Sequence, residues 1–95
     1  MSHASRATLS VLDLAPVTSG QDATQALRHS LDLAAEVDAF GYRRIWFAEH
    51  HLTPGTASAA PAVLAALAAG RTSRIRVGTG AVLLAHTSAV AALEQ

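Results

Sequence analysis

The 95-residue sequence contains no cysteine and no lysine, and only 4% of its residues are aromatic. Without cysteine, the chain forms no disulfide, no cysteine-ligated zinc site and no thiol nucleophile. All seven basic residues are arginines, and seven acidic residues balance them, so the formal net charge is zero. A neutral chain lacks the excess of positive charge that binds nucleic acids and anionic membrane surfaces. We therefore expect no nucleic-acid partner and no membrane association.

Segments that direct a protein to a membrane are also missing. The longest uncharged stretches are rich in alanine and are interrupted by glycine or proline, so no span of about 18 apolar residues emerges. Residues 1–8 do not show the basic-then-apolar order of a signal peptide. With 51% hydrophobic residues, the chain is too apolar for a disordered tail. These features predict one domain over residues 1–95, located in the cytoplasm.

What the sequence does contain is an alternation of strand-like and helix-like segments. Strands are expected at 8–14, 43–48 and 74–83, and helices at 22–41, 61–70 and 88–95. This alternation is typical of an α/β protein in which helices connect the strands of a parallel sheet. Both a doubly wound sheet and a barrel satisfy the pattern.

Local signals set the limits of the expected helices. Asp22 and Gln25 have the spacing of a capping box, which marks a helix start. Gly41 suits the left-handed position that follows a helix, and Pro61 suits the first helical position. Trp46 lies inside a predicted strand, and we expect it in the core.

Polar or small residues follow each predicted strand. They are Asp13, the cluster Glu49-His50-His51, and the run Gly78-Thr79-Gly80-Ala81. In parallel α/β architectures, chemistry takes place at the carboxyl ends of the strands. The three groups are therefore the candidate functional residues.

The cluster Glu49-His50-His51 has the side chains of acid–base chemistry, because an imidazole titrates near neutral pH. In an extended segment, Glu49 and His51 point one way and His50 points the other. Alternatively, these side chains only satisfy polar groups of the loop. Two histidines and a carboxylate also match the ligands of a metal-dependent hydrolase, with Asp13 or His86 as a further ligand. We rank this metal site last, because adjacent histidines diverge.

Gly78-Thr79-Gly80 matches part of the dinucleotide-binding fingerprint, whose third glycine is replaced here by Leu83. On its own, this match is a weak signal. The small residues either serve packing within a strand or leave backbone open to a flat ring.

Three segments together resemble a known family. They are Leu9 to Val17 (LSVLDLAPV), Trp46 to His51 (WFAEHH) and Thr72 to Gly80 (TSRIRVGTG). These segments are similar to the amino-terminal part of the bacterial luciferase-like, flavin-dependent monooxygenases. The resemblance implies a (β/α)8 TIM barrel, of which this chain forms the first three β/α units.

The resemblance also implies a chemistry. Reduced FMN, supplied by a flavin reductase and preferred here over F420, reacts with O2 to oxidise an aldehyde or another small organic substrate. His50 corresponds to the family's proton-transfer residue, so the expected catalytic residues are His50, Glu49 and His51. The expected cofactor-binding residues at the barrel mouth are Asp13, Thr79, Gly80 and Ala81. The resemblance further implies a non-prolyl cis peptide between Gly80 and Ala81.

The length of the chain leaves a second interpretation open. A complete barrel has about 250 residues, so we expect this chain to be an amino-terminal fragment that is inactive alone. Three parallel strands also leave open sheet edges, which invite pairing with another chain. The alternative to an enzyme is therefore a non-catalytic fragment that folds by association, and a homo-oligomer is expected.

Overall fold

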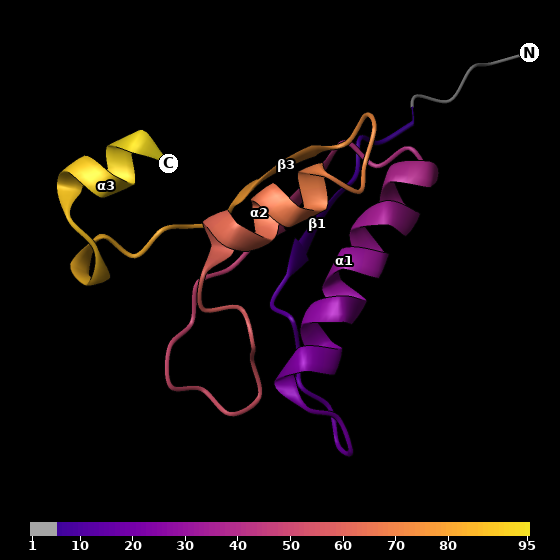
Figure 1. Ribbon diagram of the computed structural model, residues 1–95. Coiled ribbons are helices and arrows are strands. Elements are labelled where there is room, and N and C mark those ends of the chain that lie inside the picture. The colour runs from indigo at the N-terminus through magenta and orange to yellow at the C-terminus, as the bar shows by residue number, and fades with distance from the viewer. Residues whose placement is uncertain (1–5) are drawn as a thin grey trace, which may run out of the picture.

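The structure is a computed structural model that describes residues 6–95. Residues 1–5, part of the segment considered as a signal peptide, lie outside the described residues. The elements are, in chain order, β1 (Ser10–Asp13), α1 (Ala23–Ala39), β2 (Arg44–Phe47), α2 (Pro61–Ala69), β3 (Arg76–Thr79), the 3-10 helix η1 (Leu84–His86) and α3 (Ala89–Glu94). The strands form one parallel sheet in the order β1-β2-β3 (Figure 1). The expected α/β alternation with a parallel sheet is confirmed.

The register of the sheet brings all three strand ends to one edge. Phe47 lies opposite Asp13 on one side and opposite Thr79 on the other. Two further backbone hydrogen bonds extend the ladder past the strand ends. The Ala48 N–H donates to the Asp13 carbonyl (3.1 Å), and the Gly80 N–H donates to the Phe47 carbonyl (2.8 Å). The loops after β1, β2 and β3 therefore begin side by side.

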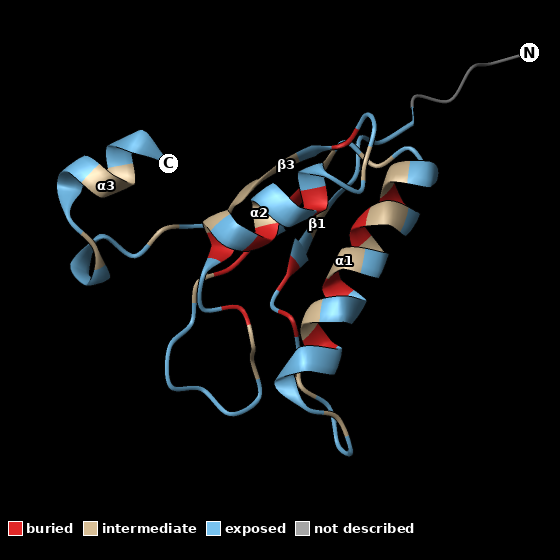
Figure 2. Cartoon of the chain, in the orientation of Figure 1, coloured by how far each residue is buried: buried red, intermediate tan, exposed pale blue. Residues whose placement is uncertain are grey.

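Helices α1 and α2 cover one face of this sheet. Ile45 and Phe47 point to this face and are fully buried. The buried core consists of Ala34, Val37, Ile45, Phe47, Leu64, Ala68 and Ile75. Figure 2 shows the buried residues of α1 and α2 on the sides that face the sheet. The core is thus a two-layer contact between a sheet and two helices.

The opposite face of the sheet is open. Leu12 and Trp46, which are register partners on adjacent strands, are 56% and 37% exposed. Our expectation that Trp46 lies in the core is therefore wrong for this chain. Strand side chains alternate between faces, so the register that buries Ile45 and Phe47 turns Trp46 to the side that α1 and α2 do not cover.

The expected helix signals are confirmed. The Gln25 N–H donates to Asp22 Oδ1 (2.8 Å), and the Asp22 N–H donates to Gln25 Oε1 (2.9 Å), which completes the capping box. Gly41 follows α1 with φ +84°, a conformation that L side chains rarely adopt. Pro61 is the first residue of α2.

Strand β3 runs from Arg76 to Thr79, within the longer expected range 74–83. Its start is later than expected because a side chain replaces the strand partner there. The Asp38 carboxylate, just before the end of α1, accepts the N–H groups of Ser73 (2.9 Å), Arg74 (3.0 Å) and Ile75 (2.8 Å). These backbone hydrogen bonds, that of Ser73 above all, lower the pKa of Asp38 below its ordinary value. Asp38 therefore fixes the turn between α2 and β3 against α1.

The carboxyl-terminal helix has little contact with the rest of the fold. Ser88 caps α3 by accepting the Ala91 N–H (3.0 Å), but no residue of α3 is buried. In Figure 1, α3 stands apart from α1, whereas Ala92 of α3 lines a pocket together with residues of α2 and β3. Among residues 6–95, every helix is too short or too polar to cross a bilayer.

We predict that Asp38→Ala lowers the urea midpoint of unfolding several-fold more than Asp32→Ala does. Asp38 satisfies three backbone donors, whereas the ion pair of Asp32 with Arg71 is largely exposed and contributes little. Because the pKa of Asp38 is lowered, its stabilisation is present above the unfolded pKa of about 4 and is lost as the pH falls through the folded value. Equal midpoints for the two variants at pH 7 would contradict this role.

Candidate active-site edge

The candidate site lies at the sheet edge where the loops after β2 and β3 begin. Glu49, His50 and His51 follow β2, and Gly80 and Ala81 follow β3. The hydrogen bond from the Gly80 N–H to the Phe47 carbonyl holds the two loop starts together. The peptide bond between Gly80 and Ala81 is cis, as the family resemblance implies.

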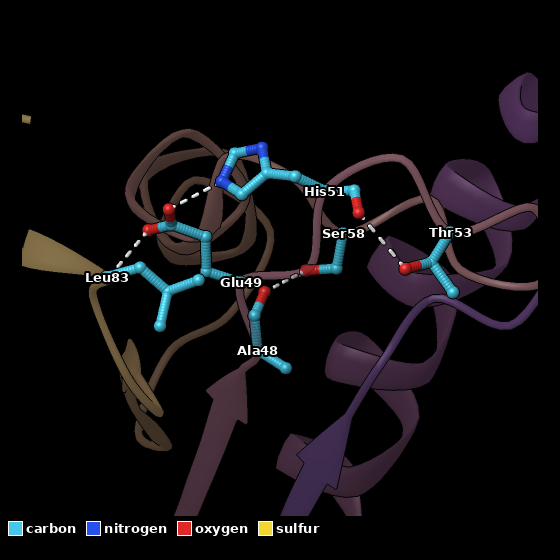
Figure 3. Close-up of polar contacts among 6 residues, drawn as sticks. All are labelled: Ala48, Glu49, His51, Thr53, Ser58 and Leu83. Carbon is cyan, nitrogen blue, oxygen red and sulfur yellow. Dashed lines mark hydrogen bonds and ion pairs between the residues drawn. The ribbon is translucent and has the colours of Figure 1, made fainter. Parts of the chain in front are cut away.

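The Glu49 carboxylate joins the two loops. Its side chain is only 9% exposed. Oε2 accepts a hydrogen bond from Nε2 of His51 (2.6 Å), and Oε1 accepts the N–H of Leu83 (3.1 Å) (Figure 3). The bond from His51, followed by the Leu83 N–H, lowers the pKa of Glu49 below its ordinary value. One anionic side chain thus bridges the loop after β2 and the loop after β3.

His51 also contacts the 3-10 helix η1. Its ring lies against the ring of His86, with the centroids 4.6 Å apart and the planes at 50°. Glu49, His51 and His86 therefore form one contiguous group on two loops. Within residues 6–95, however, no set of three or more His, Asp or Glu side chains is arranged to hold a metal ion. The metal-dependent alternative finds no ligand set there.

His50 is placed by the backbone of the loop after β2. Its N–H donates to the carbonyl of Ser58 (2.8 Å). Ser58 is fully buried, and its hydroxyl donates to the carbonyl of Ala48 (Figure 3). These two bonds close the loop from Ala48 to Ser58. Ser58 was not identified from the sequence, because a serine in a loop of small residues gives no distinctive signal.

In the cluster Glu49-His50-His51, the first and third side chains lie on the same side of the chain, as the extended segment predicts. Glu49 and His51 point the same way, because their side chains are hydrogen-bonded to each other across His50. His50 itself is exposed. The cluster therefore divides into a bonded pair and one histidine that is open to solvent.

Gly80 and Ala81 present bare backbone at the same edge. Both residues are exposed, and neither has a side chain beyond Cβ. A Cβ at Gly80 would lie 3.1 Å from Cβ of Trp46, so the position has little room for a larger residue. A planar ring can approach this backbone closely, so the residues present fit one side of a flavin site. Thr79 precedes them on the same strand face as Phe47, and it is half-buried.

The structure does not bring Asp13 together with Gly80 and Ala81. Asp13 shares the helix-covered face with its register partner Phe47 and is only 6% exposed. Its side chain lines a pocket against α1. The side chains around Gly80 are those of Leu12 and Trp46, which belong to the opposite face. The alternation of strand side chains separates the two positions.

Comparison with known proteins places the chain in a family. Residues 8–95 match the family model of the luciferase-like monooxygenases. The chain belongs to this family. One relative is the N-acetyl-S-alkylcysteine monooxygenase of Bacillus subtilis, which is 39% identical over 92% of this chain and 26% of its own length.

Solved structures support the same assignment. The crystal structure of apo-MsnO8 is 46% identical, with a TM-score of 0.84 over 87% of this chain and 25% of that chain. The oxygenating constituent of 3,6-diketocamphane monooxygenase from Pseudomonas putida, a type II Baeyer-Villiger enzyme in complex with FMN, has a TM-score of 0.76. It is 24% identical over 82% of this chain and 22% of its own, so that likeness concerns the fold. The chain spans about a quarter of the length of the curated relatives it matches.

We predict that the Glu49 carboxyl titrates below its ordinary pKa and that His51→Phe raises this pKa toward the ordinary value. The reason is that the variant removes the larger of the two hydrogen bonds that favour the carboxylate. Carboxyl 13C shifts followed against pH measure the midpoint. His29→Phe, which removes a histidine bonded to Gln21, should leave this midpoint unchanged. If the pKa of Glu49 in the native chain equals its ordinary value, the carboxylate does not join the two loops as described.

Proposed function

We propose that this chain supplies one side of the active-site mouth of a flavin-dependent monooxygenase. The reaction uses reduced FMN and O2 to oxidise an aldehyde or another small organic substrate. The observation that carries the proposal is that His50 and the exposed Gly80–Ala81 backbone lie at one edge of a parallel sheet in a chain of this family. Active sites of parallel α/β barrels lie at this edge.

Each residue of the edge has a proposed role. Gly80 and Ala81 form the backbone surface against which the flavin ring lies. Thr79, the last residue of β3, positions this surface and is the third proposed cofactor-binding residue. The exposed imidazole of His50 transfers a proton, as a histidine suits near neutral pH. Glu49 and His51 support His50 by holding the loops after β2 and β3 together. When bound, reduced FMN supplies the electrons that activate O2.

The architecture we propose is a partial TIM barrel, in which residues 1–95 form the first three β/α units of one domain. The open face with Leu12 and Trp46 is then the barrel interior, which is closed by strands outside this chain. The remaining three-quarters of the protein supplies the flavin-phosphate site and most of the substrate pocket. This chain alone is accordingly expected to bind FMN weakly and to be inactive.

The remaining parts of the proposal follow the family resemblance. FMN is the proposed cofactor in preference to F420, and the structural neighbour solved with FMN supports this choice. A flavin reductase supplies the reduced cofactor, and the enzyme works in the cytoplasm as a homo-oligomer.

A non-catalytic role by association is the second candidate. The outer edges of β1 and β3 have no neighbouring strand in the described residues, and the face with Leu12 and Trp46 is open. Such edges and surfaces favour pairing with another chain. Analytical sedimentation of the chain measures its oligomeric state and tests this alternative. A stable, well-folded monomer would exclude folding by association.

We predict that this chain can replace the matching quarter of the Bacillus subtilis N-acetyl-S-alkylcysteine monooxygenase. The chimera should bind FMN and oxidise N-acetyl-S-alkylcysteine in the presence of a flavin reductase. His50→Asn in the chimera should lower kcat at least about 100-fold, the lower end of what a proton-transfer residue contributes, with FMN affinity retained. Glu36→Gln, on the exposed side of α1, should leave kcat unchanged.

Two outcomes contradict the proposal. A folded chimera that binds no FMN would show that Gly80 and Ala81 do not serve a flavin site. An active chimera whose kcat is unaffected by His50→Asn would remove the proposed proton transfer.

A further inference from the structure

The 3-10 helix η1 is a single exposed turn that follows the proposed flavin surface in the chain. None of its three residues is buried, and the His86 N–H closes the turn by donating to the Leu83 carbonyl (3.0 Å). A segment with few buried contacts opens easily unless other contacts hold it. The contacts between η1 and the loop after β2 therefore bear on the backbone of Gly80 and Ala81, which precedes this turn.

Two contacts join the turn to the loop after β2. The Leu83 N–H donates to Oε1 of Glu49 (3.1 Å). The ring of His86 lies against the ring of His51, with the centroids 4.6 Å apart, a separation typical of paired aromatic rings. Glu49 and His51 are themselves joined by a hydrogen bond of 2.6 Å. The four residues thus form a closed cycle of contacts across the two loops.

The hydrogen bond within this cycle requires one orientation of the His51 ring. The pKa of Glu49 is lowered by its hydrogen bonds, so its carboxylate is ionised near neutral pH and only accepts. Nε2 of His51 therefore carries the proton of the bond and has to point at Glu49. The ring of His86 lies against this ring and restricts the rotation that would break the bond.

We propose that His86 is a positioning residue for the flavin surface. Through His51, it fixes the segment that follows Gly80 and Ala81, while the hydrogen bond from the Gly80 N–H to the Phe47 carbonyl (2.8 Å) fixes the segment's start. The backbone that faces the flavin ring is thus held on both sides. This inference rests on the proposed function, because it gives His86 a part in flavin binding at the same site.

The first test follows the Nε2 proton of His51 by NMR in the 95-residue chain, without flavin. His86→Ala removes the ring that packs on His51 and should speed the exchange of this proton with water about three- to tenfold, the effect of losing one aromatic pair. His86→Phe keeps an aromatic ring and should retain the native rate. His29→Ala, which removes an exposed histidine bonded to Gln21, should also leave the rate unchanged. Because His86 is exposed, neither of its variants removes a core contact.

The second test measures FMN binding by the chimera with the Bacillus subtilis monooxygenase. His86→Ala should weaken FMN binding about three- to tenfold, and the loss should fall on KM for reduced FMN more than on kcat. His86→Phe should bind FMN as the native chimera does. This pattern is the opposite of that expected for His50→Asn, which lowers kcat and retains FMN affinity.

The proposal is overturned if His86→Ala binds FMN as tightly as the native chimera does, or if the His51 proton exchanges at the native rate in that variant. It is also overturned if His86→Phe is as weak as His86→Ala, because ring packing is then not what His86 supplies. A native chimera that folds but binds no FMN contradicts the proposed function instead. The flavin-free exchange of the His51 proton still decides, in that case, whether His86 holds the two loops together.

Discussion

The parallel register around Phe47 is the constraint on which the rest of the structure depends. Phe47 is fully buried and pairs with Asp13 on one side and with Thr79 on the other. This pairing brings three strand ends to one edge and also decides which face each side chain occupies. A slip of one residue would turn Phe47 out of the core and exchange the two faces of β2. The position of the candidate site follows from the burial of this side chain.

The polar contacts at this edge act between loops. Glu49 holds the loop after β2 to the loop after β3 through His51 and the Leu83 N–H. At the other end of β3, Asp38 ties helix α1 to the turn before the strand by accepting three backbone N–H groups. Both carboxylates have a lowered pKa for the same reason, since hydrogen-bond donors favour the charged form. Strand β3 is thus fixed at both ends by carboxylates from other parts of the chain, Asp38 of α1 before it and Glu49 of the loop after β2 beyond it.

Much of this fold was predictable from the sequence, because its signals are local. The Asp22 cap and the start of α2 at Pro61 depend on residues within one helical turn. The tie from Asp38 to residues 73–75 was not predictable, because it joins groups more than 30 residues apart. The exposure of Trp46 and the helix-side position of Asp13 were missed for a related reason. A strand pattern gives the alternation of side chains, but the packing of helices decides which face is covered.

The central claim is that His50 and the Gly80–Ala81 backbone lie together at the edge of the sheet that forms the active-site mouth, whereas Asp13 lies on the helix-covered face. The most direct test is a crystal structure of the chimera with bound FMN. The account predicts that His50 and the Gly80–Ala81 backbone lie within about 4 Å of the flavin ring and that Asp13 does not touch it. A flavin ring in contact with Asp13, and remote from His50 and Gly80, would contradict the account.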